Sequence, residues 1–317
     1  MRYIGFDVGG TKCAVTVANV ENGMVEFEGK RAFATPSPWQ EAVEQMFCAA
    51  EELLGGRRAD ACGFSCGSPL DAERGIILAP PNLPGWDHVP VTQLASERFG
   101  MPAFLENDAN ACALAEWRWG AGRGTKHMVF LTFGTGMGAG LILEGRLIRG
   151  ANGNAGEVGH MRLSAFGPAG YGKEGSFEGF CSGGGVKQLG VTLGKRAVQS
   201  GVTPAYFDGN WEQVSAKSIA QAALAGDETA REVYRLCGEK LGEALSVLVD
   251  VLNPERIVIG SIFARSGELL CGEMQRVMRR ECLSQNLAVC EVVPAGLGEK
   301  LGDYAALCVA EYGLGAC

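Results

Sequence analysis

The chain has 317 residues, of which 47% are hydrophobic and 20% are charged, and its net charge is -8. This composition is typical of a globular protein with room for two domains. The negative charge is spread without a basic block, which argues against a nucleic-acid partner. No run of about eighteen apolar residues is present and no apolar signal region follows Met1, so we expect no membrane span and a cytoplasmic location.

We interpret the 12 cysteines as small core residues and not as disulfide partners or metal ligands. Most of them lie in apolar stretches, where a free cysteine behaves as a small hydrophobic residue. The sequence has no C-x-x-C pair, and the closest spacing, Cys62 with Cys66, lies in a strand-like segment. This usage indicates a reducing compartment.

The chain begins with a strand, a glycine turn and a second strand. Residues 3–7 and 13–20 are apolar enough for strands, and residues 9–12 form the turn between them. Asn22-Gly23 then predicts a hairpin into a third strand at 24–27. A helix follows, opened by Ser37-Pro38 and closed by Gly55-Gly56. Its apolar positions recur at helical spacing and predict a core-facing stripe: Val43, Met46, Phe47, Ala50, Leu53 and Leu54.

A polar turn near residue 107 supplies our candidate catalytic base. An apolar strand at 102–105 runs into Asn107-Asp108, and an Ala- and Leu-rich helix follows at 109–116. Asp108 is the candidate because N–H groups at a helix start stabilise an ionised carboxylate. The alternative is that Asn107 or Asp108 only caps the helix, as most such residues do.

The second half of the chain repeats the order of the first. A strand at 127–133, a glycine-rich turn at 134–140 and a strand at 141–143 lead through Glu144-Gly145 into a strand at 146–148. Two such units predict a duplicated fold with a ligand cleft between the copies. The remaining expected elements are helices at 215–225, 228–252 and 302–312 and a buried strand at 256–259, followed by a Gly260-Ser261 turn.

Both glycine turns are predicted to bind phosphate. In the turn from Asp7 to Lys12, a carboxylate ends a strand and two glycines allow close approach of an anion to backbone N–H groups. The spacing is not that of a Walker A loop, and a plain hairpin with a solvated Asp and Lys is the alternative. The 134–140 turn partly matches a dinucleotide fingerprint, but that fingerprint opens a helix and this turn continues as a strand. The sequence of this turn therefore fits a pair of hairpin turns that clamp a triphosphate better than it fits a dinucleotide-binding site.

A second group of polar residues follows the 150–156 loop of small residues. Glu157, His160 and Glu178 combine two carboxylates with an imidazole, which suits a polyol whose hydroxyls each need a donor and an acceptor. Taken singly, each residue is better explained as a capping Glu or a structural His. Their nearness to glycine-rich loops favours a sugar site.

With these residues assembled, the sequence resembles the ROK family of bacterial sugar kinases and sugar-responsive repressors. The resemblance covers nearly the whole chain, and its ordered motifs are Asp7 to Lys12, Pro81 to Trp86, Asn107 to Asn110, Gly134 to Gly140, Gly156 to His160 and Leu301-Gly302-Asp303. The resemblance implies an α/β, two-lobed actin-like ATPase fold, related to ribonuclease H, with an interlobe cleft. It suggests a small lobe of residues 1–112 with 301–317 and a large lobe of residues 113–300.

The resemblance also implies roles for the motif residues. Asp108 takes a proton from a hexose hydroxyl, usually the one on C6, while lobe closure excludes water. The expected sugar-binding residues are Asn82, Asn107, Asp108, Glu157, His160 and Glu178. Those expected to bind ATP are Asp7, Gly9, Gly10, Thr11, Lys12, Gly134, Thr135, Gly136, Gly260 and Ser261. Asp7 is expected to orient Mg²⁺ through water.

Two departures from the family pattern matter. Many members bind zinc through the His of Glu-x-Gly-His and three cysteines, whose positions here hold Ala169, Tyr171 and Ser176. These side chains cannot replace thiolates, so we expect no structural zinc, with the 167–175 loop held by other contacts or mobile. The second departure is Gly260-Ser261, where the family usually has a run of glycines near the adenosine, so ATP is a less secure expectation than phosphoryl transfer.

The leading interpretation is an ATP-dependent hexose kinase of the glucokinase, fructokinase or N-acetylhexosamine kinase type. The alternative is a catalytically silent sugar-binding protein of the same family. A repressor is disfavoured because Asp7 lies almost at the terminus, with no recognition helix before it. A nicotinamide oxidoreductase rests only on the rejected glycine match. We also expect a homodimer, for which the helical region at 215–252 offers a self-complementary surface.

Overall fold

The computed structural model describes residues 1–315, which fall into two compact units. The first unit comprises Met1–Thr125, Gly140–Ala155 and the described residues from Gly296 onward. The second comprises Lys126–Ala139 and Gly156–Ala295. Each unit is described by itself below.

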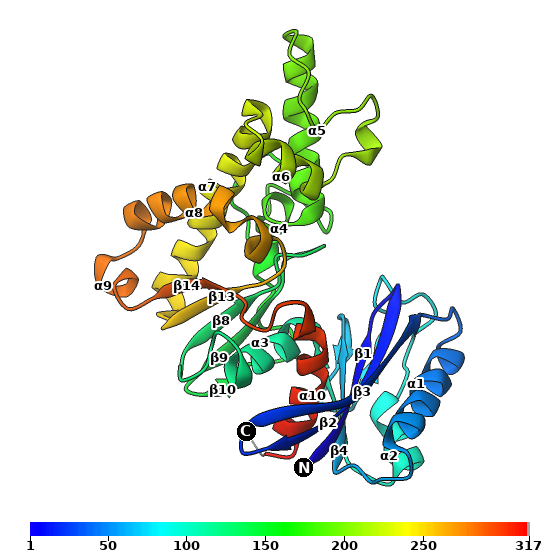
Figure 1. Ribbon diagram of the computed structural model, residues 1–317. Helices are drawn as coiled ribbons and strands as arrows, with labels where there is room; N and C mark the ends of the chain where they lie inside the picture. Colours follow the sequence, from blue (N-terminus) through cyan, green and yellow to red (C-terminus); the bar gives the residue numbers. More distant parts are fainter. Residues whose placement is uncertain (316–317) are drawn as a thin grey trace. The chain divides into compact units, whose positions relative to one another are not determined.

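A five-stranded sheet of order β3-β2-β1-β4-β7 forms the centre of the first unit (Figure 1). The strands are β1 Arg2–Val8, β2 Lys12–Glu21, β3 Met24–Ala34, β4 Ala61–Cys66 and β7 Ala103–Asn107. β1, β4 and β7 run parallel, whereas β2 pairs antiparallel with both β1 and β3. β4 is buried along its whole length, as expected for a strand covered on both faces. The carboxyl ends of the three parallel strands therefore lie at one edge of this sheet.

Helices cover both faces of the first sheet. Ile4, Phe6 and Val8 of β1 pack in one core cluster with the apolar stripe of α1, whereas Tyr3, on the opposite face, packs with Leu307 of α10. Figure 1 shows α1 and α2 on the side of the sheet away from α10. The helices are α1 Trp39–Leu54, α2 Val91–Phe99, α3 Asp108–Trp119 and α10 Leu301–Gly313. Shorter elements are β5 Leu70–Asp71, β6 Ile76–Ile77 and η3 Gly298–Lys300.

The second sheet has the order β10-β9-β8-β13-β14, which repeats the arrangement of the first: a hairpin on one side and three parallel strands on the other. Its strands are β8 Met128–Leu131, β9 Ala139–Leu143, β10 Arg146–Leu147, β13 Arg256–Ile259 and β14 Glu291–Pro294. β8 and β13 pair in register from Met128 with Arg256 to Leu131 with Ile259. The duplication predicted from the sequence therefore appears in the strand order.

The second unit contains β8, β13 and β14 of this sheet, and helices dominate the rest of it. They are α4 Phe177–Phe180, α5 Gly183–Gln199, α6 Ala216–Leu224, α7 Glu228–Leu252, α8 Ile262–Glu281 and α9 Ser284–Leu287. Shorter elements are η1 Val158–His160, η2 Trp211–Gln213, β11 Ala169–Gly170 and β12 Lys173–Glu174. α7 packs closely on α8 because it presents glycines, and a Cβ at Gly242 would lie 2.7 Å from the Met274 carbonyl oxygen.

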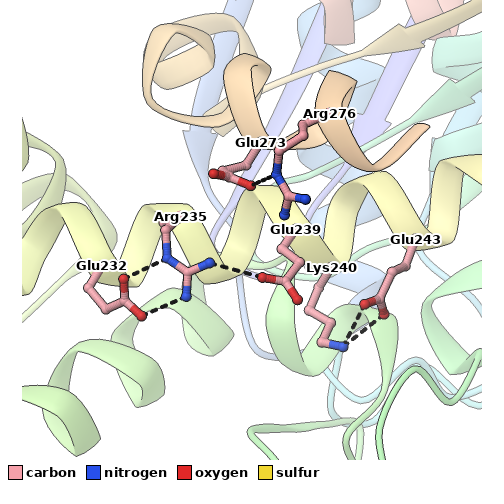
Figure 2. Close-up of polar contacts among 7 residues, drawn as sticks. All are labelled: Glu232, Arg235, Glu239, Lys240, Glu243, Glu273 and Arg276. Atoms are coloured by element: carbon pink, nitrogen blue, oxygen red, sulfur yellow. Dashed lines mark hydrogen bonds and ion pairs between the residues drawn. The ribbon is translucent and has the colours of Figure 1, made fainter. Parts of the chain in front are cut away.

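The solvent side of α7 carries a row of ion pairs (Figure 2). Arg235 lies between Glu232 and Glu239, with N–O distances of 2.6 and 3.0 Å, and Lys240 pairs with Glu243 at 2.8 Å. These i,i+3 and i,i+4 contacts each stabilise the helix by about 0.3–0.5 kcal/mol. Arg235 and Glu232 are exposed, whereas Lys240 and Glu243 are partly buried.

Most elements predicted from the sequence are confirmed, and α7 and β13 have the predicted bounds. α8 was not predicted. Its N-cap, Ser261, makes no side-chain capping bond, and Ser266 inside it has non-helical angles (φ -133, ψ 19). The predicted lobe boundaries remain a prediction, and residues 316–317 of the predicted small lobe lie outside the described residues. Among residues 1–315, no helix is long and apolar enough to cross a membrane.

Candidate active site

Three functional segments meet at the carboxyl edge of the first sheet. Val8 of β1 is in register with Cys66 of β4, and Cys66 is in register with Asn107 of β7. The residues at or just beyond these strand ends therefore lie together: Asp7, the Gly67-Ser68 turn and Asp108. Ligands of parallel sheets bind at this edge, because the loops that leave the strands converge there.

The turn that carries Asp108 is held by its own backbone and by Asn107. Asn107 is the N-cap of α3, and its side-chain oxygen accepts from the N–H groups of Ala109 at 2.9 Å and Asn110 at 3.3 Å. Its amide nitrogen donates to the Ser68 hydroxyl at 2.9 Å. Asn107 thus acts as the cap, while Asp108 is the first helical residue and its side chain is exposed. Asn107 is therefore the N-cap, and Oδ1 of Asp108 also accepts from the Ala109 N–H at 2.8 Å.

Both carboxylates at this edge bind protons more readily than isolated ones do. Desolvation raises the pKa of Asp108, although hydrogen bonds from Ala109 and Asn107 act to lower it. Asp108 remains accessible to solvent even though nearby protein atoms displace much of the bulk water around it. Desolvation, and then repulsion by Asp108 and Asp303, raises the pKa of Asp7 to about 6. Desolvated carboxylates that face one another resist losing both protons.

Asn82 reaches the same place from the loop between β6 and α2. A Cβ built on Gly67 would lie 3.7 Å from the Asn82 side-chain oxygen and 4.0 Å from Oδ2 of Asp108. Both side chains therefore border the space above Gly67. Gly10 is also essential to this packing, because a Cβ at Gly10 would overlap the Asn82 carbonyl oxygen.

The first glycine turn is short and closed. The Gly9 N–H donates to the Lys12 carbonyl at 3.2 Å, and the Thr35 hydroxyl donates to the Gly9 carbonyl at 2.5 Å. Gly10, Thr11 and Lys12 are exposed at its tip. An exposed, closed glycine turn can present backbone N–H groups and a lysine to an anion.

Asp303 is a site neighbour whose role the sequence did not reveal. Lys30 pairs with Asp303 at 2.6 Å, and the Thr16 hydroxyl donates to the same carboxylate at 3.3 Å. The preceding Gly302 lies against Asp7, since a Cβ there would be 3.0 Å from Oδ2 of Asp7. These contacts hold the first turn of α10 beside Asp7.

The second unit contains a cavity of about 970 Å³ at the carboxyl ends of β8 and β13. Gly134 and Thr135 line it after β8, Ser261 lines it after β13, and Gly183-Gly184 line it from the start of α5. The N–H groups at a helix start and in a glycine turn suit a phosphate chain. Three cationic residues also line the cavity, namely Lys187, Lys217 and Arg265. We call it the glycine-turn cavity.

Ser261 has an unusual backbone at this cavity. Its φ of 50 and ψ of -108 lie in a region that favours glycine. A Cβ on Gly134 would be 3.5 Å from the Ser261 hydroxyl oxygen, so this hydroxyl is beside the 134–136 turn. Of the residues predicted to bind ATP in this unit, Gly134, Thr135 and Ser261 line the cavity.

Glu178 lies close to the second glycine turn. Its Oε2 accepts from the Met137 N–H at 3.0 Å, and a Cβ on Gly136 would be 2.8 Å from the same oxygen. Gly159 also borders Glu178, since a Cβ at Gly159 would be 3.3 Å from the Glu178 Cβ. Glu157 and His160 flank Gly159 in and beside η1, and both are exposed. The structure thus brings together the three residues predicted to bind sugar from this unit.

A sequence model described as the ROK family matches residues 3–311. The chain belongs to the ROK family. Its sequence is 31% identical to a glucokinase from Thermotoga maritima over 303 residues, covering 95% of each chain. It is also 30% identical over 282 residues to a putative xylose repressor from a Caldicellulosiruptor species, covering 87% of this chain and 69% of the repressor.

A solved structure of a ROK family glucokinase from Streptomyces griseus, in complex with glucose and AMPPNP, resembles this ROK protein with a TM-score of 0.78 and 30% identity. The match covers 98% of this chain and 100% of the glucokinase. The predicted α/β, actin-like ATPase fold is therefore confirmed.

The 167–175 loop of this ROK protein is held by contacts between its own residues and nearby ones. β11 and β12 form a small hairpin, and the Gln188 side chain bonds both the N–H and the carbonyl of Ala169 at 2.9 Å. Lys173 donates to the His160 carbonyl, and the His160 ring meets the Tyr171 ring edge-on at 5.4 Å. Within residues 1–315, no group of three or more His, Cys, Asp or Glu side chains is arranged to hold a metal. The expectation of no structural zinc stays a prediction.

Sequence reasoning did not identify the residues that α5, α6 and α8 contribute to the glycine-turn cavity. Gly183-Gly184, after the N-cap Ser182, were a visible signal, because glycines at a helix start often accommodate phosphate. The residues from α6 and α8 had no such signal, since only the fold brings them to β8 and β13.

Proposed function

We propose that this ROK protein is a hexose kinase that transfers the γ-phosphoryl group of ATP to the C6 hydroxyl of its sugar, with Asp108 as general base. The observation that carries the proposal is the exposed Asp108 carboxylate at the start of α3, with a raised pKa and Asn82 beside it. A raised pKa makes the carboxylate a better proton acceptor, provided that it is ionised at the working pH. The glucokinase relatives support the same reaction class.

Each unit contains donors and acceptors that suit sugar hydroxyls. Asn82 and Asn107 offer amide groups, and Glu157, His160 and Glu178 offer carboxylate and imidazole groups for the remaining hydroxyls. Glu178 is oriented by the Met137 N–H. Each such contact positions the reacting hydroxyl, and positioning supplies much of the catalysis in phosphoryl transfer.

The donor nucleotide is assigned to the glycine turns. Gly134, Thr135 and Ser261, with the N–H groups at the start of α5, receive the phosphates in the glycine-turn cavity, while Gly260 supports Ser261 and Gly136 borders Glu178. In the first unit, the turn of Gly9, Gly10, Thr11 and Lys12 offers backbone N–H groups and a cation that suit a phosphate. Asp7 has the carboxylate chemistry that Mg²⁺ prefers and would hold it through water. Bound Mg²⁺ supplies charge neutralisation on the phosphates.

The test is ADP release with Mg-ATP over a panel of hexoses that includes glucose, fructose, mannose and N-acetylhexosamines. Sugar-dependent turnover in the wild type, lost in Asp108→Asn, is the expected result. Sugar binding by calorimetry without turnover for any sugar would overturn the kinase proposal and favour the silent sugar-binding alternative. Glucose is the first sugar to try, because the relatives are named glucokinases.

We also propose a cytoplasmic homodimer, with α6 and α7 contributing to its surface. The exposed charged side chains of α7, such as Glu232 and Arg235, would lie on this surface (Figure 2). A light-scattering mass equal to twice that of one chain is expected. A mass equal to one chain would contradict the dimer.

A further inference from the structure

Glu106 supports the turn of the proposed base from behind. It lies two residues before Asp108 in β7, and its side chain is 3% exposed. One carboxylate oxygen, Oε1, accepts from the Asn107 N–H at 3.1 Å and from the Asn110 side-chain amide at 3.0 Å. Asn107 caps α3 and Asn110 lies in its first turn, so Glu106 contacts the residues on both sides of Asp108.

Arg149 holds the other oxygen of the same carboxylate. Its Nε lies 2.8 Å and its Nη2 lies 2.7 Å from Oε2 of Glu106. The guanidinium is also 5.7 Å from the centre of the Tyr312 ring. A planar guanidinium that makes two bonds sets both the position and the orientation of a carboxylate. The two oxygens of Glu106 therefore have separate tasks, since one faces the turn and one faces Arg149.

Arg149 also begins the chain segment that leads to Glu157. Its carbonyl accepts from the Ala155 N–H at 3.0 Å, which closes the 149–155 loop on Arg149. Arg149 thus holds the Asn107-Asp108 turn (the base turn), through the bond of its side chain to Glu106, and the 149–155 loop, through its backbone carbonyl.

We propose that Glu106 and Arg149 are positioning residues for the phosphoryl-transfer reaction, because together they set the orientation of the Asn107-Asp108 turn. This inference rests on the proposed kinase function. Breaking a buried ion pair leaves an uncompensated charge, which here lies directly behind the N-cap of α3. The turn then loses its fixed geometry, and small displacements of a reacting group have large effects on rate.

The chain contains a matched pair for comparison. Arg118 binds Glu311 with distances of 3.2 and 2.9 Å, and the Glu311 side chain is 4% exposed. Arg118 lies in the last turn of α3, whereas Glu106, the partner of Arg149, lies in β7 just before the N-cap of the same helix. Loss of either pair leaves a buried carboxylate, but only one of these carboxylates contacts the base turn.

A cavity of about 440 Å³ borders the Glu106–Arg149 pair and gives access for chemical rescue. Phe104, Leu114 and Tyr312 are among the residues that line it. In Arg149→Ala, the removed side chain adds to this space, so a small guanidinium compound can take its place beside Glu106.

The experiment compares Arg149→Ala, Glu106→Gln and Arg118→Ala with the wild type. We expect kcat to fall about 10- to 100-fold in the first two variants, with the KM for ATP changed less than about threefold, and kcat to stay within about twofold of the wild type in Arg118→Ala. Methylguanidinium at millimolar concentration should restore part of the kcat of Arg149→Ala and leave the other two variants unchanged. Glu106→Gln keeps the shape of the side chain and serves where Arg149→Ala folds poorly.

A second measurement does not require turnover. Deuterium exchange of the Ala109 and Asn110 amides, which Asn107 holds, should be faster in Arg149→Ala and unchanged in Arg118→Ala. Equal exchange in both variants, or losses of kcat that only follow the loss of Tm in all three, would overturn the inference. Absence of turnover in the wild type would instead overturn the kinase proposal, and the exchange result would still decide whether the pair orders the turn.

Discussion

The carboxyl edges of the two sheets have opposite chemistry. The first edge gathers the carboxylates of Asp7, Asp108 and Asp303, with Lys30 bound to Asp303. The second edge, at the glycine-turn cavity, offers glycines, hydroxyls, a helix start and three cationic residues. The same strand order thus supports two kinds of surface, because the strand ends set positions and the residues after them set charge.

This difference suggests that the two edges have different roles in the reaction. Crowded carboxylates raise one another's proton affinity, which suits removal of a proton from a neutral hydroxyl. Backbone N–H groups and cations suit a polyanion instead. Substitutions at the first edge and then at the second test this assignment.

The largest effect is expected for Asp108→Asn. Loss of the general base should lower kcat by about 10²–10⁴-fold, because an amide cannot accept the proton. Sugar affinity by calorimetry should change little, since the amide keeps the size of the side chain. Adding Asn110→Asp, which puts an acid two residues further along α3, should not restore activity. A kcat within tenfold of the wild type would remove Asp108 from the mechanism.

The pH dependence should separate activity from stability at the first edge. Asp7 and Asp108 must be ionised, so kcat/KM should fall about tenfold per pH unit below about 6, where Asp7 takes up its proton, and more steeply where Asp108, whose pKa is also raised, is protonated as well. The free energy of unfolding should change with pH in the opposite direction to kcat/KM. A raised carboxyl pKa means that the folded state binds more protons than the unfolded state, so the contribution of Asp7 to stability is lost as pH rises from its ordinary value to about 6.

The control for this pH effect is Asp7→Asn. Its Tm relative to that of the wild type should increase over the same pH window, because the variant has no charge to bury at this position. A constant Tm difference across the window would show that the pKa of Asp7 is not raised.

An intermediate effect is expected for Gly136→Ala. The new Cβ would lie 2.8 Å from Oε2 of Glu178, so the carboxylate must move. We expect the KM for the hexose to rise about tenfold, equal to about 1.4 kcal/mol, while the KM for ATP stays near its wild-type value. Gly272→Ala in α8, where the new Cβ would have no atom within 4 Å, is the control. A rise in the KM for ATP alone would assign Gly136 to the nucleotide.

The smallest effect is expected at Ser261. Ser261→Gly should raise Tm, because a left-handed backbone costs a non-glycine residue about 1–3 kcal/mol. Both Ser261→Gly and Ser261→Ala should raise the KM for ATP about threefold, since each removes the hydroxyl, worth about 0.5–1.5 kcal/mol in a hydrogen bond. An unchanged KM for ATP in both variants would exclude the hydroxyl from nucleotide binding.

The sequence predicted the elements whose ends carry local signals. α7 was predicted with its bounds because Asp227 caps its start and Asn253, in a left-handed conformation, ends it. β13 is a continuous apolar run. α8 lacks both signals, since Ser261 makes no capping bond and Ser266 interrupts the helix.

The candidate site shows the same contrast between residues with a local sequence signal and residues without one. Asp108 and the glycine turns were found because short motifs carry them. The partners that hold them were not found, because Lys30 and Asp303 are 273 positions apart and Glu106 and Arg149 are 43 apart. Pairings of this kind are made by the fold, and no local pattern in one sequence encodes them.

The packing of α10 has a consequence for the order of assembly on the ribosome. Gly5 and Gly63 lie against the backbone of α10, and a Cβ at Gly5 would be 3.0 Å from the Leu307 nitrogen. The first sheet to be translated thus receives the helix on its second face only after the last residues of α10 leave the exit tunnel. Until then, one apolar face of the nascent sheet is exposed to solvent, and we expect chaperones that bind exposed apolar surface to bind the growing chain.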